Sequence, residues 1–245
     1  SIELKNKDLT LSLPVAKGTD CRQAIDISRL RRDTGLVTLD NGFENTASCK
    51  SAITFIDGEN GILRYRGYDI ETLAAEASFV ETAYLLLYGE LPDRTELTHF
   101  SQLLNESSLI HEDMHHFFTG FPCTAHPMGI LSTMVSSLAA FYPIPDEPTP
   151  EEEQRILGSL ISQIRTIAAF SYKKSIGDPI VYPSVKLTFV WNFMNMMFSS
   201  PVKEYEPDSE LLRAIEVFLI LHADHGQNCS TSTVRMTGSS LSNLY

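Results

Sequence analysis

The first part of the chain alternates apolar and polar positions with a period of two. Leu9, Leu11 and Leu13 alternate with polar neighbours, and short apolar runs follow at 37–39 and 53–56. The turn sequence Asp57-Gly-Glu-Asn-Gly61 separates two apolar runs, which is typical of a hairpin whose turn contains residues that tolerate positive φ. We therefore predict a small N-terminal β module with a hairpin over residues 1–67.

After Tyr68 the period changes to about 3.6, and helix-start signals recur. Ser, Asp or Thr precedes Glu at the capping-box spacing in three places, which are Ser78 with Glu81, Asp93 with Glu96, and Thr149 with Glu152. One helix should end near Tyr88, before Gly89, and another near Phe141. We therefore predict a mainly α protein, with a helical domain over residues 68–245.

The last clear helix of this pattern is expected to begin after Asp208. It places one apolar stripe and two histidines on a single face, formed by Leu211, Ile215, Phe218, His222 and His225.

Composition narrows the class of protein. The 245 residues are 43% hydrophobic and 20% charged, which is typical of a globular chain rather than a disordered one. Nineteen basic and 31 acidic residues give a net charge of −12, which disfavours nucleic acid and anionic membrane as partners. Four widely spaced cysteines and the lack of a long apolar run predict a cytoplasmic protein without a membrane anchor.

Two segments contain residue types that bind metals. His111-Glu-Asp-Met-His115 matches the H-E-x-x-H pattern of zinc hydrolases, in which Glu112 would activate water. No third ligand motif follows it, so we do not favour a zinc site. We instead interpret the segment as a surface turn of a helix whose buried stripe consists of Ile110, Met114, Phe117, Phe118 and Phe121. The methionines between Trp191 and Phe198 fit core packing better than a copper site.

The segment from Leu221 to Arg235 contains the most informative polar residues. His222 and His225 are three residues apart at the end of the apolar stripe, followed by Asn228 and Ser230. Such histidines are either a hydrogen-bonded core pair or a site for a carboxylate or keto group. The residues alone leave both interpretations open.

Eight motifs follow one another along the chain, at 46–51, 53–58, 61–68, 84–92, 126–128, 172–177, 192–198 and 222–235. In these motifs and their order, the chain resembles bacterial-type citrate synthases with an N-terminal β module. The resemblance implies a helical two-domain enzyme that condenses acetyl-CoA with oxaloacetate and water to citrate and CoA. It further implies a dimer or hexamer, acetyl-CoA as a substrate, no cofactor and no metal.

The resemblance also assigns roles to individual residues. His225 matches the histidine that hydrogen-bonds oxaloacetate, His222 is the residue that orients it, and Asn228 lines the same pocket. Ser230 matches a serine that supports a catalytic histidine. That histidine and the catalytic aspartate belong to family segments beyond the point matching Tyr245, so we expect a truncated domain that is inactive alone.

Two alternatives remain beside a citrate synthase fragment. One is a fragment of 2-methylcitrate synthase, and the other is a non-catalytic truncated paralogue that acts as an interaction subunit. Gly226 stands where the family has glutamate, which removes a charge beside the expected pocket. Val202 stands where some NADH-inhibited members have cysteine, so NADH control is not predicted.

Overall fold

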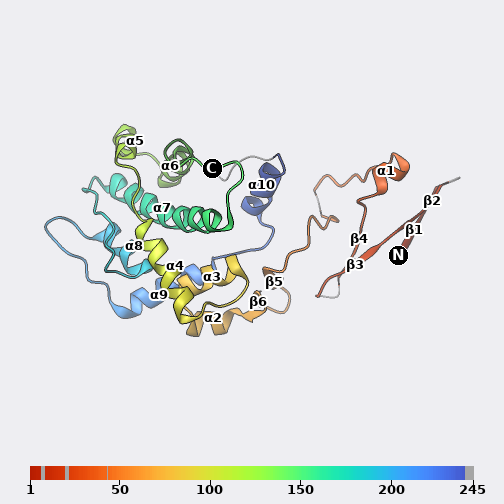
Figure 1. Cartoon of the computed structure of the whole chain (residues 1–245), viewed down its shortest axis with the longest axis horizontal. Coiled ribbons are helices and arrows are strands. Elements are labelled where there is room, and N and C mark those ends of the chain that lie inside the picture. Colours follow the sequence, from red (N-terminus) through yellow and green to blue (C-terminus); the bar gives the residue numbers. More distant parts are fainter. Residues whose placement is uncertain (7–8, 20–21, 43, 241–245) are drawn as a thin grey trace. The chain divides into compact units, whose positions relative to one another are not determined.

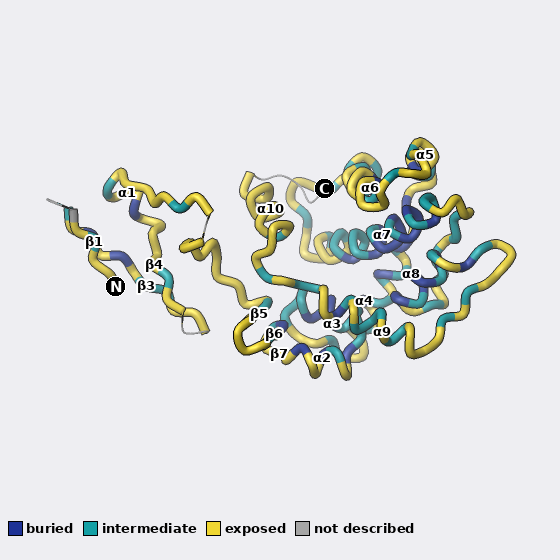
Figure 2. The backbone as a smooth tube through the Cα atoms, turned by 180° about the vertical axis from the view of Figure 1, so that it is seen from behind, coloured by how far each residue is buried: buried dark blue, intermediate teal, exposed yellow. Residues whose placement is uncertain are grey.

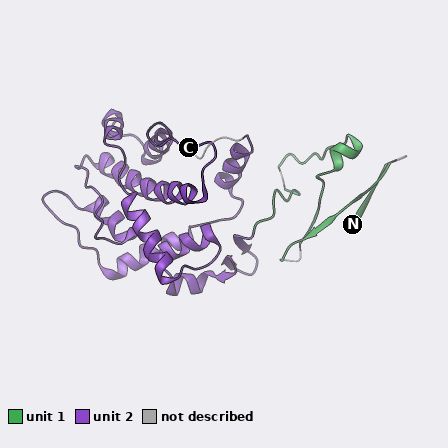
Figure 3. Cartoon of the chain, in the orientation of Figure 1, with its two compact units in different colours: residues 1–51 green, residues 52–245 purple. Residues whose placement is uncertain are grey.

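The computed structural model describes residues 1–245 except 7–8, 20–21, 43 and 241–245. The chain divides into two compact units, Ser1–Ser51 and Ala52–Tyr245 (Figure 3). The second unit is mainly helical, which confirms the predicted fold class. Within the described residues, no helix has both the length and the apolar character needed to cross a bilayer.

The first unit contains two short antiparallel hairpins and one helical turn. β1 (Ile2–Asn6) pairs with β2 (Leu9–Leu13), and β3 (Val15–Lys17) pairs with β4 (Gln23–Ile25). Leu11 and Leu13 pack with Leu30 of α1 (Leu30–Thr34) in a small apolar cluster. The run at 37–39 forms no strand, and both Val37 and Leu39 are strongly exposed, so the prediction of β structure there is wrong.

The predicted hairpin is present but belongs to the second unit. β5 (Thr54–Asp57) pairs with β6 (Ile62–Tyr65) in antiparallel register, and β7 (Tyr68–Asp69) pairs with β6. Gly61 adopts φ +66° in the turn, as the sequence predicts. Tyr65 lies in one apolar cluster with residues of the following helices. The compact units divide between residues 51 and 52, so the hairpin of the predicted β module belongs to the same unit as the helices.

The helices of the second unit follow the hairpin in chain order (Figure 1). They are α2 (Ile70–Glu76), α3 (Phe79–Tyr88), α4 (Arg94–Glu106), the 3-10 helix η1 (Glu112–Met114), α5 (His115–Gly120), α6 (Pro127–Phe141), α7 (Pro150–Ile176), α8 (Phe189–Phe198), α9 (Ser209–Leu221) and α10 (Cys229–Gly238). Ser78, Asp93 and Thr149 each form the predicted capping box. Gly89 ends α3 in the left-handed conformation, at φ +96°.

The long helix α7 organises the core, with α4, α6 and α8 packed against it. Figure 2 shows its middle and C-terminal turns as the most continuously buried part of the unit. Met194 and Met196 of α8 are buried in apolar clusters, which confirms the packing interpretation of this segment.

Two cations lie inside this core and are held mainly by carbonyl and hydroxyl oxygen atoms, with one carboxylate. Arg165 donates to the Phe189 carbonyl (3.0 Å) and to Ser108 Oγ (2.6 Å), and burial lowers its pKa to about 10. Lys173 donates to the Ser199 carbonyl (2.6 Å) and to Asp178 (3.2 Å). These bonds satisfy charged groups that would otherwise be costly to bury.

The C-terminal part of the prediction needs two corrections. α9 ends at Leu221, so the proposed single face does not continue to His225, and Leu211 and Phe218 of that face are exposed. A further helix, α10, follows the histidines, although the sequence analysis predicted none after α9. All but one of the described residues of α10 are exposed, as its colouring in Figure 2 shows.

Candidate functional site

The candidate site is the segment between α9 and α10, here called the histidine loop and comprising residues 222–228. It contains His222, His225 and Asn228, with Ser230 in the first turn of α10. The position of this loop depends on how α9 is held at its sides and its end.

Helix α9 is fixed by two charged side chains that meet the ends of other helices. Arg213 donates through Nη1 to the Ala77 carbonyl (2.9 Å) and through Nη2 to the Ala74 carbonyl, at the C-terminal end of α2. Glu216 accepts from the Phe79 amide (2.6 Å) at the start of α3. A cation at a helix C-terminus and an anion at an N-terminus both match the helix dipole. Burial raises the pKa of Glu216, and the Phe79 amide and Arg213 oppose this shift.

The end of α9 is held by the hydroxyl group of Tyr65, a fully buried side chain of β6. This oxygen lies 3.1 Å from the carbonyl oxygens of both Ile220 and Asp224, and it accepts from the Asp224 amide at 3.3 Å. Burial raises the pKa of Tyr65, and the nearby Asp224 carboxylate also raises it. The protonated phenol therefore links the last turn of α9 to the loop.

Asp224 is the second attachment point of the histidine loop. Its Oδ2 accepts from Thr54 Oγ1 of β5 (2.5 Å) and from the Gly226 amide (2.8 Å). Gly226 has φ +65°, a left-handed conformation that favours glycine. A larger residue there would be strained, although a Cβ would meet only Ile56 Cδ1 at 3.7 Å. The loop thus bends back toward the β5–β6 hairpin, and the bend lies at Asp224, between the two histidines.

The two histidine side chains lie together on the outside of this bend. His222 Nδ1 is 2.7 Å from the Phe218 carbonyl, and its ring stacks on that of Phe218 at a centroid distance of 4.2 Å. Because a carbonyl only accepts, Nδ1 carries the proton and Nε2 of the neutral ring is an acceptor. The His225 ring approaches His222 edge-on at 5.8 Å, and both residues are exposed.

Asn228 and Ser230 belong to the start of α10. Asn228 is the N-cap, and its Oδ1 accepts from the Thr231 amide at 2.8 Å. The side chain of Asn228 is thus used in capping. Ser230 is exposed in the first turn, where the amide groups of a helix have no partners within the helix. The structure therefore brings His222 and His225 into ring contact and places a helix N-terminus next in the chain, an arrangement that favours a carboxylate.

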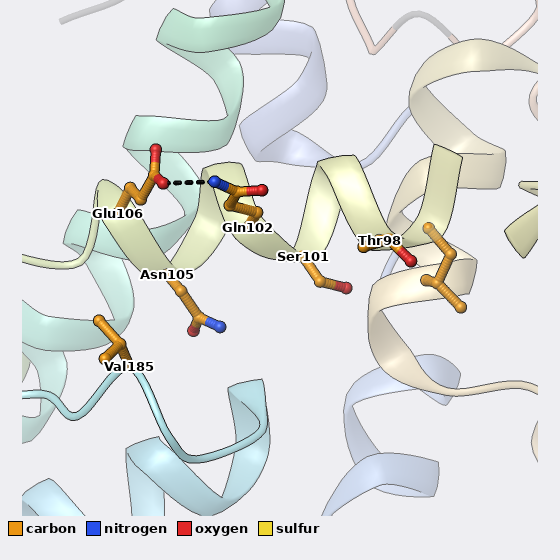
Figure 4. A pocket seen from close by; sticks show the side chains of 7 residues that line it. Thr98, Ser101, Gln102, Asn105, Glu106 and Val185 are labelled. Carbon is orange, nitrogen blue, oxygen red and sulfur yellow. Dashed lines mark hydrogen bonds between the residues drawn. The ribbon is translucent and has the colours of Figure 1, made fainter. Parts of the chain in front are cut away.

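A hollow lies away from the histidine loop, on the outer face of α4 (Figure 4). Six of its lining residues are labelled there, namely Thr98, Ser101, Gln102, Asn105, Glu106 and Val185, and Leu97 completes the lining. Gln102 donates to Glu106 at 2.7 Å across this face. The lining contains a carboxylate and no cation, so it does not favour an anionic substrate.

The His111–His115 segment does not form one metal-binding helix turn. His111 is the N-cap of η1, where its Nδ1 accepts from the Asp113 amide (3.2 Å), and His115 begins α5. The described residues contain no group of three or more His, Cys, Asp or Glu side chains that could hold a metal ion. Most of the predicted buried stripe is correct, but Phe117 is exposed.

The family model described as "Citrate synthase, C-terminal domain" matches residues 42–245. The chain is 46% identical over 236 residues to "Citrate synthase 1" of two Mycobacterium tuberculosis strains, CDC 1551 / Oshkosh and H37Rv. Each alignment covers 96% of this chain and 55% of the relative.

Two solved structures have the same fold. Citrate synthase from Thermotoga maritima MSB8 matches with a TM-score of 0.72 and 30% identity, over 85% of this chain and 53% of the other. Citrate synthase from Pyrobaculum aerophilum matches with a TM-score of 0.76 and 30% identity, over 100% and 56%. The chain therefore belongs to the citrate synthase family. It spans about half the length of the curated relatives it matches.

Sequence reasoning missed the residues that support the loop. Tyr65, Thr54, Arg213 and Glu216 lie outside the histidine motif, and Tyr65 and Thr54 are at least 155 positions from their loop partners. Asp224 lies within the motif, and its position between two histidines was the one local signal that could have identified it.

Proposed function

We propose that this chain provides the oxaloacetate-binding part of a citrate synthase, an acyltransferase that condenses acetyl-CoA with oxaloacetate and water to citrate and CoA. The observation that carries the proposal is 46% identity to citrate synthases along 96% of the chain. The exposed histidine pair beside the start of α10 agrees with a site for a dicarboxylate.

Each candidate residue has a separate role in this proposal. His225 donates a hydrogen bond to oxaloacetate, and His222 orients it through the edge-on ring contact. Asn228 lines the pocket and caps α10, so its substitution would affect both the site and the helix. Ser230 supports a catalytic histidine supplied by a segment outside these 245 residues.

The enolisation step explains why such a segment is needed. Removal of the α-proton of acetyl-CoA requires a base, and the thioester carbonyl needs a hydrogen-bond donor as charge develops on it. The histidine loop binds the second substrate, oxaloacetate, whose keto carbon the enolate attacks. In this division of labour acetyl-CoA is a substrate, and no resident cofactor is required.

The proposal includes self-association and a cytoplasmic location. Large apolar side chains such as Met128 (61% exposed), Phe218 (56%) and Met236 (71%) support burial against other protein surface. The experiment is sedimentation of the purified chain over a concentration series. A dimer or hexamer supports self-association, and a monomer at all concentrations contradicts it.

A non-catalytic interaction subunit is the second candidate function, and Gly226 is the observation that favours it. Gly226 contributes no charged side chain on the C-terminal side of His225, although Asp224 precedes that histidine. Such a subunit would co-purify with a longer homologue and would leave oxaloacetate unbound. A 2-methylcitrate synthase would bind oxaloacetate as well, and an assay of the natural protein with propionyl-CoA against acetyl-CoA separates that case.

Isothermal titration of the purified chain with oxaloacetate tests the main proposal. We expect saturable binding that weakens about tenfold or more in His225→Ala, because a charge-assisted hydrogen bond contributes roughly 1.5–3 kcal/mol. His99→Ala, an exposed histidine on α4, is the matched control and should bind like the unmodified chain. Absence of binding, or equal binding by both variants, would contradict the proposed role of His225.

A further inference from the structure

We infer that Asp224, Thr54 and Tyr65 are positioning residues that hold His222 and His225 in the geometry needed for substrate, using the hairpin β5–β6 as a fixed support. The inference rests on the proposed function of the loop as the oxaloacetate site. It assigns a role in that site to residues of the hairpin, which lie far from the histidine motif in sequence.

Asp224 links the histidine loop to the hairpin. It is partly buried between two exposed histidines, and its carboxylate faces the hairpin. One oxygen, Oδ2, receives both the Thr54 hydroxyl and the Gly226 amide. The first bond joins the loop to a strand 170 residues away, and the second closes the turn that carries His225. Loss of this carboxylate would therefore remove both hydrogen bonds.

Tyr65 acts on the other side of the loop. Its hydroxyl lies within hydrogen-bond distance of Ile220 and Asp224, which stand on either side of residues 221–223. Ile220 is in the last turn of α9, where helix carbonyls have no partners within the helix, and Asp224 lies three residues beyond the helix. Tyr65 thereby sets where α9 stops and where the loop begins, and so the direction in which the chain presents His222.

The hairpin can support the loop only if it is itself fixed, and contacts to α3 fix it. Arg66 donates through Nη2 to the Leu86 carbonyl near the end of α3 (2.8 Å), and its amide donates to the Ile53 carbonyl (2.7 Å). Arg66 is the one described non-glycine residue with positive φ, at +51°. Such a conformation persists only where surrounding contacts enforce it. The β6–β7 turn is therefore fixed to α3 while β5 and β6 hold the loop.

The physical consequence is preorganisation of the histidine pair. When a site becomes ordered only on binding, the free energy of ordering it reduces the affinity. A loop that is held at both ends has already been ordered by folding, so binding does not include this cost. Removing the Thr54 hydroxyl should therefore weaken oxaloacetate binding by about tenfold, although Thr54 does not belong to the proposed set of substrate contacts.

The experiment compares two threonine-to-valine variants in the full 245-residue chain. Thr54→Val removes the donor to Asp224, and Thr166→Val removes a fully buried hydroxyl in α7 that donates to the Ser108 carbonyl at 2.7 Å. Thr166 is more buried than Thr54, so Thr166→Val should lower the thermal stability of the chain at least as much as Thr54→Val. We expect weaker oxaloacetate binding in Thr54→Val alone, and recovery in Thr54→Ser. Equal affinity of the two valine variants would overturn the inference.

A second readout does not need substrate. The ¹⁵N shifts of the imidazole nitrogens report the tautomer of His222, which the structure places as the Nδ1–H form. Tyr65→Phe and Thr54→Val should reduce this form and broaden the His225 resonances, and Thr166→Val should leave them unchanged. If oxaloacetate does not bind the unmodified chain, the proposed function fails while this measurement still decides the inference. Unchanged imidazole spectra in all three variants would overturn it.

Discussion

The β1–β2 hairpin of the first unit and the β5–β6 hairpin of the second unit have similar strand pairing but differ in how much helix packs against them. The β1–β2 ladder has five residue pairs and the β5–β6 ladder has four, so their backbone hydrogen bonding is similar. In the second unit, Tyr65 is fully buried with residues of α2, α3 and α9. In the first unit, the strands share a small cluster with one leucine of a five-residue helix.

Because strand pairing is similar in the two hairpins, we expect side-chain burial to determine which of them is the more rigid. An isolated two-stranded hairpin is marginally stable in water, and packing against a helix is what stabilises it. We expect amides of β6 to exchange with solvent more slowly than those of β2. The histidine loop is attached to the hairpin that has this packing.

The largest expected effect is a cavity in the core around α7. Leu138 of α6 is fully buried in the apolar cluster shared with α7, so Leu138→Ala should lower the free energy of unfolding by about 2–5 kcal/mol. Urea denaturation followed by circular dichroism measures this change. Leu211→Ala, at a leucine that is 41% exposed, is the control, and an equal loss in both variants would contradict the burial pattern.

A smaller effect is expected from the same substitution in the first unit. Leu13 is 3% exposed, so Leu13→Ala removes apolar burial that contributes about 1.5–3 kcal/mol to stability. The Leu13 side chain has few neighbours, so its removal leaves little cavity. Exchange of the β1 and β2 amides should become close to that of an unfolded chain. Leu39→Ala, 90% exposed, should leave it unchanged, and slow β2 exchange in Leu13→Ala would refute the comparison.

The helix cap of α7 should contribute about 1 kcal/mol. Thr149 Oγ1 accepts from the Glu152 amide, and Glu152 accepts from the Thr149 amide at 2.8 Å. Thr149→Ala removes the first of these bonds, with an expected cost of about 0.5–2 kcal/mol in a urea melt. Ser136→Ala, exposed within α6, should change stability little. A Thr149→Ala variant as stable as Ser136→Ala would contradict the capping role.

The smallest effect concerns pH and Glu216. Its pKa in the folded protein is raised above the ordinary value of 4.5, chiefly by burial. The folded state therefore holds the proton more tightly, and the associated stability is present below pH 4.5 and is lost as pH rises through the raised pKa. In thermal melts, Glu216→Gln should show a weaker decline over this range, because glutamine does not titrate. Its side-chain oxygen can still accept from the Phe79 amide, which keeps the contact at the start of α3. The exposed Glu210→Gln should follow the unmodified profile, and parallel profiles for all three proteins would exclude this effect.

Local features of the fold were predictable from the sequence because they depend on neighbouring residues. The capping boxes at Ser78, Asp93 and Thr149 and the left-handed Gly89 each involve groups within a few positions, and the structure confirms all four. Buried Met194 and Met196 followed in the same way from the apolar character of their helix.

Other features depend on groups that are distant in sequence or lack a pattern. Helix α10 is rich in serine and threonine and has no apolar stripe, so hydrophobic periodicity gave no signal for it. The end of α9 at Leu221 depends on Tyr65, whose contacts no local pattern reveals. The substrate roles of His222, His225, Asn228 and Ser230 came from resemblance and remain predictions, whereas their placement around one loop is a structural finding.

The attachment of the loop to Tyr65 also has a consequence during synthesis on the ribosome. The partners of the Tyr65 hydroxyl are encoded 155 to 159 positions later. At translation rates of about 5–20 residues per second, the hairpin therefore waits on the order of ten seconds or more for them. During that interval a large aromatic side chain lacks its cover from α9, and the nascent chain carries an apolar surface of the kind that chaperones bind. The histidine loop can reach its final form only after that delay.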